Sequence, residues 1–142
     1  MNQRSQQDRR VTLANPAGLY DPTPNGYSHL AIIPAGSRLV YVAGQGGETE
    51  TGGLSPDFQT QVRQAFDNLL AALSAAGATP TDVAKLTVLI VDHSEARLHI
   101  LGAALDRAWG SGPKPACTLI PVPRLALDGM LFEVEAVAAI PG

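Results

Sequence analysis

Two glutamates near the C-terminus, Glu133 and Glu135, are the residues whose type and spacing most suggest chemistry. They lie two positions apart in an otherwise apolar segment, and side chains at that spacing in a strand point to the same side. On a covered sheet face such a carboxylate can orient a water molecule or accept a proton. On the solvated outer face of an edge strand it would do neither, and the spacing alone leaves both interpretations open.

Cys117 is the only cysteine of the chain and follows a loop rich in glycine and proline. A single free thiol is more often an inert packing residue than a nucleophile. A nucleophilic or redox-responsive role would need activation, for which Arg124 is a candidate partner, and no histidine is placed to act as its base. Tyr27 and Arg124 are the other polar side chains near expected strand ends. Because one cysteine cannot form an internal disulfide, the chain fits a reducing cytoplasm.

Signals for bound cofactors are missing from the sequence. The histidines His29, His93 and His99 lack the paired spacing of metal ligands. The segment Gly44-Gln45-Gly46-Gly47 is glycine-rich, but no Lys-Ser or Lys-Thr pair follows it, as a phosphate-binding loop requires. The Gly-x-Ser-x-Gly motif of a nucleophilic serine is also absent. We therefore expect neither a metal nor an organic cofactor.

Length and composition indicate one compact domain. The chain has 142 residues, 45% hydrophobic and 16% charged, with a formal net charge of −3. The acidic excess argues against a nucleic-acid binder. The polar first residues do not resemble a signal peptide, and no stretch approaches the roughly 18 apolar residues of a membrane span. We expect a flexible tail over residues 1–14 and a single domain over residues 15–142.

Hydrophobic periodicity predicts seven elements in the order ββαβαββ. One helix should begin at Ser55-Pro56-Asp57 and stop at Gly77, and a second should begin at Asp92 or Ser94 and stop at Gly110. The expected strands cover residues 27–33, 39–43, 83–91, 116–122 and 131–138. Since about four turn residues separate the first two strands, they are predicted to pair as an antiparallel hairpin.

This order predicts an α+β fold in which both helices cover one face of a mixed sheet. The other face would then be uncovered. The segment Val83–Val91 is too apolar to face water on either side. We therefore expect a homo-oligomer, in which a second copy covers the open face.

Several motifs together resemble one family. They are Asn25-Gly26-Tyr27-Ser28, Val42-Ala43-Gly44-Gln45, the Gln-x-x-x-Ala-Phe-Asp-Asn-Leu run from Gln61, Thr87-Val88-Leu89-Ile90-Val91-Asp92, Lys114-Pro115-Ala116 and Phe132-Glu133-Val134-Glu135-Ala136. Over residues 20–139 the chain resembles the Rid family of reactive-intermediate deaminases, also called YjgF/YER057c/UK114. The resemblance implies a chorismate-mutase-like fold of the Bacillus type and a homotrimer. The three sheets would form a central barrel with clefts at the subunit interfaces.

The resemblance also implies an activity. Deaminases of this family hydrolyse imines and enamines formed from amino acids, releasing ammonia and a 2-oxo acid without metal or organic cofactor. By resemblance, Glu133 matches the glutamate that positions the attacking water, Tyr27 matches a tyrosine of the cleft, and the backbone around Gly44 lines it. The implied partners are a small-molecule substrate and two further copies of the chain, with no membrane.

The chain departs from the deaminase pattern at two positions. Cys117 stands where the deaminases carry an arginine that grips the substrate carboxylate, and a thiol cannot replace that bidentate contact. Ala43 stands where a substrate-binding serine is frequent. We keep Ala43, Gly44, Tyr27 and Arg124 as candidate substrate-binding residues, and Glu133 and Cys117 as candidate catalytic residues.

Three interpretations follow from these departures. The cleft could hydrolyse imines of a different substrate class, or Cys117 could make the protein a thiol-dependent hydrolase or a redox-responsive protein. Alternatively, the trimer could bind a small metabolite or act as a regulator without catalysis. Family members are also described as endoribonucleases or translation inhibitors, which the acidic composition disfavours here.

Overall fold

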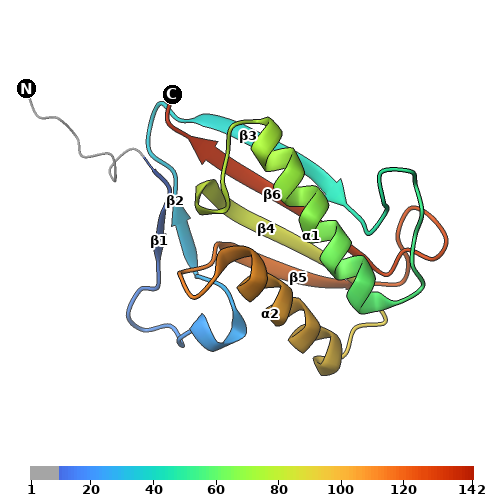
Figure 1. The fold of residues 1–142 in the computed structure, drawn as a ribbon. Helices are drawn as coiled ribbons and strands as arrows, with labels where there is room; N and C mark the ends of the chain where they lie inside the picture. The colour runs from blue at the N-terminus through green and yellow to red at the C-terminus, as the bar shows by residue number, and fades with distance from the viewer. Residues whose placement is uncertain (1–9) are drawn as a thin grey trace, which may run out of the picture.

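The computed structural model describes residues 10–142 (Figure 1). Its elements are β1 (Thr12–Ala14), β2 (Leu30–Ile32), β3 (Arg38–Gln45), α1 (Phe58–Ala75), β4 (Val83–Val91), α2 (Glu95–Trp109), β5 (Ala116–Val122) and β6 (Phe132–Ile140), with short 3₁₀ helices at Thr23–Asn25 and Pro80–Asp82. Strands β4 and β5 match their predicted ranges residue for residue. Within the described residues, no helix is both long and apolar enough to cross a membrane.

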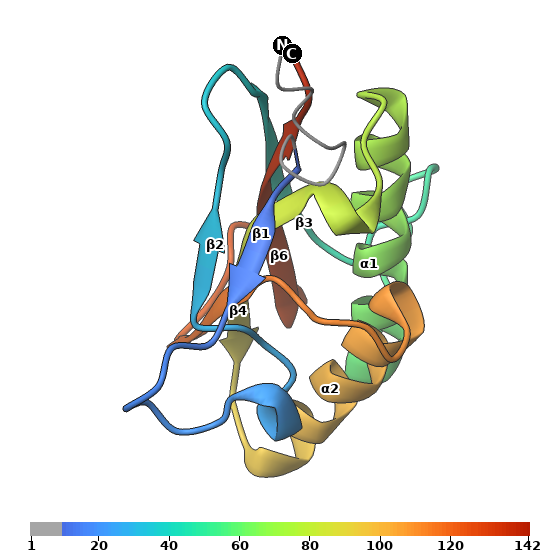
Figure 2. The ribbon, with the colours of Figure 1, turned by 90° about the vertical axis from the view of Figure 1, so that its left-hand side faces the viewer.

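The main sheet has four strands in the order β3-β6-β4-β5. Strand β6 pairs antiparallel with both β3 and β4, whereas β4 and β5 run parallel. A parallel pair needs a crossover, and α2 supplies it. Both helices lie on the same face of the sheet, and the opposite face carries no helix (Figures 1 and 2). The predicted α+β fold class is confirmed.

The core lies between the sheet and α1. Phe66 and Phe132 are buried, and their ring centroids are 5.8 Å apart. The same side of the sheet presents a row of buried aliphatic residues from β4 and β6, which are Leu86, Val88, Ile90, Val134, Ala136 and Ala138. Burying this apolar area is the main stabilising term of such a domain.

The helix termini follow their capping residues. Asp57 caps α1 and accepts a hydrogen bond from the Thr60 N–H at 2.9 Å. Of the two predicted caps of α2, Ser94 is the one used, because its hydroxyl accepts from the Arg97 N–H at 3.2 Å. Asp92 instead occupies the turn after β4 with φ of 52°.

The predicted hairpin between the first two strands is wrong. Strand β3 pairs with β6 in the main sheet, and β2 pairs with β1, where Thr12 lies opposite Ile32. The turn residues between these two strands favoured pairing of the strands with each other as a hairpin. Burying Val42 of β3 under α1, however, requires β3 to lie beside β6, which is distant in sequence. The β1–β2 ribbon crosses one end of the main sheet (Figure 1).

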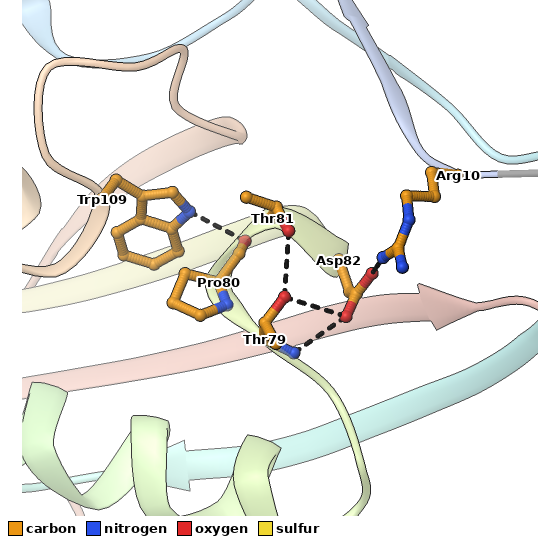
Figure 3. Close-up of polar contacts among 6 residues, drawn as sticks. All are labelled: Arg10, Thr79, Pro80, Thr81, Asp82 and Trp109. Atoms are coloured by element: carbon orange, nitrogen blue, oxygen red, sulfur yellow. Dashed lines mark hydrogen bonds and ion pairs between the residues drawn. The ribbon is translucent and has the colours of Figure 1, made fainter. Parts of the chain in front are cut away.

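Ordered structure begins before the predicted boundary at residue 15. Strand β1 falls within the segment expected to be a tail, of which residues 1–9 lie outside the described residues. Arg10 donates to the buried carboxylate of Asp82 at 3.0 Å, and Asp82 also accepts from the Thr79 N–H at 2.8 Å (Figure 3). Trp109 at the end of α2 donates its indole N–H to the Pro80 carbonyl at 2.9 Å. These bonds attach β1 and α2 to the turn before β4.

The uncovered face of the sheet is partly apolar, as the sequence predicted. Tyr41 and Leu39 of β3 are 74% and 51% exposed, and Ile120 of β5 is 43% exposed. Glu133 and Glu135 share this face, because they lie opposite Leu89 and Thr87 in the β6–β4 register, whereas Phe132 and Val134 point to the core. In the isolated chain, both glutamates are therefore on the open face.

Candidate active site

A β-bulge in β3 brings the backbone of Gly44, which has no side chain, next to the Glu133 carboxylate. Val42 pairs with Ala136 and Gln45 with Val134, so that Ala43 and Gly44 together lie opposite Glu135. An extra residue of this kind bends a strand and re-aims its neighbours. A β-carbon on Gly44 would overlap the Glu133 carboxylate, because the Cδ atom of Glu133 would lie only 2.6 Å from that β-carbon. Glycine at position 44 therefore leaves the space that the carboxylate occupies.

The electrostatic environment makes Glu133 harder to ionise than an ordinary glutamate. Partial burial is the largest cause and raises the pKa of Glu133. The negative charges of Glu48 and Glu135 raise this pKa further. A glutamate with a raised pKa is a better proton acceptor once ionised, which is the property that general-base chemistry uses.

Helix α1 holds the two segments around Glu133 through buried amides. Gln61 is fully buried and donates to the Ser55 carbonyl at 2.7 Å and the Gly129 carbonyl at 2.9 Å. Its side-chain oxygen accepts from the Leu131 N–H at 2.9 Å, two residues before Glu133. One helix residue thus fixes the start of β6 and the loop before α1.

Asn68, two turns along α1, holds the segment that follows β3. Its amide donates to the carbonyls of Gly46 at 3.0 Å and Glu48 at 2.8 Å. Gln64 donates to the Asn68 oxygen at 2.9 Å and so orients this amide. The sequence alone predicted no role for these amides. Their spacing of three and four places Gln61, Gln64 and Asn68 on one helix face, which is the signal that could have found them.

Gln61→Ala is expected to destabilise the fold by about 3 kcal/mol, because it leaves two carbonyls and one N–H without partners in a buried site. Chemical denaturation measures this loss. Gln59→Ala is the matched control, since Gln59 is exposed on the same helix and should change stability by less than about 0.5 kcal/mol. Equal stabilities of the two variants would contradict the assigned role of Gln61.

Tyr27 is held next to the start of β5. Its neighbour Ser28 is buried and donates its hydroxyl to the Lys114 carbonyl at 2.6 Å, and its N–H to the Pro115 carbonyl at 3.2 Å. The Tyr27 ring makes an edge contact with His29, with 5.6 Å between their centroids. These contacts place the ring beside Cys117, and both residues line one cavity of about 310 Å³.

Cys117 and Glu133 point to opposite faces of the sheet. Cys117 lies opposite Leu86, whose side chain is buried on the helix side, whereas Glu133 lies opposite Leu89 on the open side. A single chain therefore holds the candidate residues in two separate groups, which we call half-sites. One consists of Glu133 and Gly44 near the β3 edge, and the other consists of Tyr27 and Cys117 at the β5 edge.

The surroundings of Cys117 do not activate its thiol. Burial raises the pKa of Cys117 to about 11, although the positive charge of Lys85 acts in the opposite direction. Arg124 follows the far end of β5, and seven residues of extended chain place it roughly 20 Å from Cys117 in the same chain. Arg124 pairs instead with Asp128 at 3.0 Å. The structure thus argues against a nucleophilic Cys117 activated by Arg124.

Cys117 is expected to react with iodoacetamide at pH 8 about 10²-fold more slowly than free cysteine, because a raised pKa leaves little thiolate. The rate is measured by mass spectrometry, with the urea-unfolded protein as the control that should react at the ordinary rate. A folded-state rate equal to or above that of free cysteine would revive the thiol-dependent interpretation.

The remaining candidates are arranged as follows. Ala43 is exposed in the bulge beside Gly44, and Arg124 is exposed in the loop between β5 and β6. Over residues 10–142, no group of three or more histidine, cysteine, aspartate or glutamate side chains could hold a metal ion. The half-sites present a carboxylate, a phenol, a thiol and backbone amides.

The arrangement of helices and strands defines a class of protein. The mixed sheet with both helices on one face fits the chorismate-mutase-like α+β architecture. A family model described as "Endoribonuclease L-PSP" matches residues 21–140. The chain belongs to this family, which is also called Rid or YjgF/YER057c/UK114, as its similarity to solved members supports.

Individual relatives agree over most of the chain. The RutC family protein YjgH of Escherichia coli is 38% identical over 115 residues, which are 81% of this chain and 85% of that protein. The structure of YyfB from Yersinia pestis, a conserved Rid family protein of unknown function, has a TM-score of 0.87 and 33% identity, covering 92% of this chain and 99% of its own. RidA from an Antarctic Psychrobacter has a TM-score of 0.67 and 27% identity, covering 98% and 100%.

Proposed function

We propose that the protein hydrolyses imines or enamines with release of ammonia, at clefts formed between copies of the chain. The observation that carries this proposal is the Glu133 carboxylate against the bare backbone of Gly44, with its pKa raised by burial and neighbouring charge. Membership of a family that contains imine deaminases supports the same reaction class.

The reaction needs only a held water and a proton carrier. Glu133 accepts a proton from water while the water oxygen bonds to the carbon of the protonated imine, giving a tetrahedral aminoalcohol. The proton then passes from Glu133 to the nitrogen. The carbon–nitrogen bond then breaks while the hydroxyl proton of the aminoalcohol passes back to Glu133, so that ammonia and a carbonyl compound leave. An enamine first takes up a proton at carbon to become the imine, and no oxidant or reductant is consumed.

A cyclic assembly would join the two half-sites. The β3 and β5 strands are the two edges of the sheet, so a head-to-tail ring brings the β3 edge of one copy to the β5 edge of the next. Glu133 and Gly44 of one copy would then lie next to the sheet edge that carries Tyr27 and Cys117 of its neighbour. The exposed apolar residues of the open face support burial inside such a ring, and three copies match the family resemblance.

The test is ammonia release from freshly generated imines and enamines, half bearing a carboxylate and half lacking one. We expect saturable acceleration over buffer for the members without a carboxylate, because Cys117 offers no charge to bind one. Light scattering on the same preparation should give the mass of a trimer. No acceleration of ammonia release for any member of the panel would overturn the proposed reaction.

Glu48→Gln is expected to shift the acid limb of the kcat/KM profile to lower pH. The active form of Glu133 is the carboxylate, so activity is lost as pH falls through its pKa. Glu48 helps raise that pKa, and its removal lowers it. The matched control is Glu50→Gln, an exposed acid two residues away that should leave the profile in place. An unmoved limb in Glu48→Gln would contradict the electrostatic coupling.

A non-catalytic metabolite-binding trimer is the second candidate. The observation that favours it is the replacement of the carboxylate-binding arginine by Cys117, which leaves a cavity without the usual charged contact. Ligand binding to the wild type without turnover across the imine panel would support this function.

A further inference from the structure

The cavity beside Cys117 has an apolar wall built by α2 and β5. It measures about 310 Å³ and is lined by Tyr27, Leu98, Leu101, Leu105, Cys117 and Leu119, together with Asn25, Gly26 and Thr118. The three leucines of α2 recur at spacings of three and four and therefore face the cavity as one stripe. No residue of this lining carries a charge at neutral pH, since the only titratable groups are a phenol and a buried thiol.

This lining discriminates strongly between ligands. A carboxylate entering the cavity would lose its hydration without a charged residue in the lining to pair with, which is unfavourable. The ammonium of Lys85, which is not part of the lining, is already bonded to the Thr118 hydroxyl at 2.6 Å. An alkyl or aryl group would instead exchange water for leucine side chains, and each added methylene strengthens binding about fourfold. A volume near the lower end for ligand pockets suits a small group rather than an extended molecule.

We infer that this cavity is the specificity pocket of the protein and receives the uncharged, apolar substituent of the imine. The substrate class is therefore imines of short alkyl or aryl aldehydes and ketones that carry no carboxylate. This inference rests on the proposed deaminase function and adds the side of the substrate that Glu133 does not contact.

The main experiment measures kcat/KM along a series of alkyl imines from two to seven carbons, each generated in place by an amine oxidase. We expect the value to rise about fourfold per methylene until the cavity is filled. Imines of equal length that end in a carboxylate should be at least 10²-fold poorer. Values of kcat/KM that do not depend on chain length, or that are higher for the carboxylate series, would contradict the assigned pocket but would still support the deaminase reaction.

Variants at the cavity test whether this chain-length dependence arises at Cys117. Cys117→Phe fills the space and should lower kcat/KM for the hexyl imine far more than for the ethyl imine. Cys117→Arg should reverse the preference toward the carboxylate series, because a guanidinium supplies the missing charged partner. Ala103→Phe is the control, since Ala103 is exposed on α2 and does not line the cavity. Equal length dependence in Cys117→Phe and wild type would contradict the inference.

A binding measurement separates failure of the pocket from failure of the reaction. Hexan-1-ol should protect Cys117 from slow alkylation, whereas hexanoate at the same concentration should not. If no imine is hydrolysed but hexan-1-ol protects the thiol, the result supports the apolar pocket and contradicts the deaminase function. If both compounds or neither compound protects, the assigned specificity is overturned.

Discussion

Glu133→Gln is expected to lower kcat/KM for imine hydrolysis by about 10²–10⁴-fold, the contribution typical of a positioned general base. The amide keeps the shape of the side chain but cannot accept a proton from water. It should also keep the fold, because the change removes a partly buried carboxylate whose ionisation is already disfavoured. Ammonia release on the most reactive imine of the panel measures the effect.

Glu135→Gln is the matched control for this substitution. Glu135 shares the strand and the face of Glu133 but is exposed and lies opposite the bulge. We expect its loss to change kcat/KM by less than about tenfold and to lower the pKa of Glu133, since one neighbouring negative charge disappears. Equal activity of Glu133→Gln and wild type would contradict the catalytic role of Glu133.

Gly44→Ala is expected to reduce kcat/KM by about 10²-fold, because a displacement of about 1 Å in a reacting group can cost that much. The new methyl group would overlap the Glu133 carboxylate and push it from its position. The backbone at Gly44 has no positive φ, so alanine adds steric overlap there without backbone strain.

The control for this change is Gly102→Ala on α2, where a β-carbon meets no atom within 4 Å. It should leave activity unchanged and slightly stabilise the helix, since alanine is the better helix former. A crystal structure of Gly44→Ala should show the Glu133 side chain in another rotamer. Full activity together with that displaced carboxylate would argue that its observed position is not the reactive one.

Local patterns predicted most of the fold because they act within a few residues. The apolar stripe of α1, the cap at Asp57 and the continuous apolar run of β4 all signal their own elements. Pairing between distant strands has no such local signal. The prediction failed at β3, whose position depends on β6 at the other end of the chain, and at β1, which depends on the distant partner β2 and on Asp82.

The candidate site was predictable in its residues but not in its arrangement. Period-two alternation placed Glu133 and Glu135 on one face, and the family resemblance singled out Gly44, Tyr27 and Cys117 as cleft residues. Which face of the sheet each side chain occupies depends on register. Only the pairing of Cys117 with Leu86, and of Glu133 with Leu89, shows that one chain separates the half-sites.

The claim that a working cleft combines half-sites of two copies is tested most directly by mixed oligomers. Glu133→Gln and Cys117→Phe subunits, carrying different tags, are co-expressed, and oligomers that contain both are isolated. In a ring of three copies that contains both variants, about a third of the clefts join an intact Glu133 to an intact Cys117 pocket. The account predicts that the mixture recovers about that fraction of wild-type hexyl-imine hydrolysis, whereas each variant alone is nearly inactive. Mixed oligomers no more active than the separate variants would contradict it.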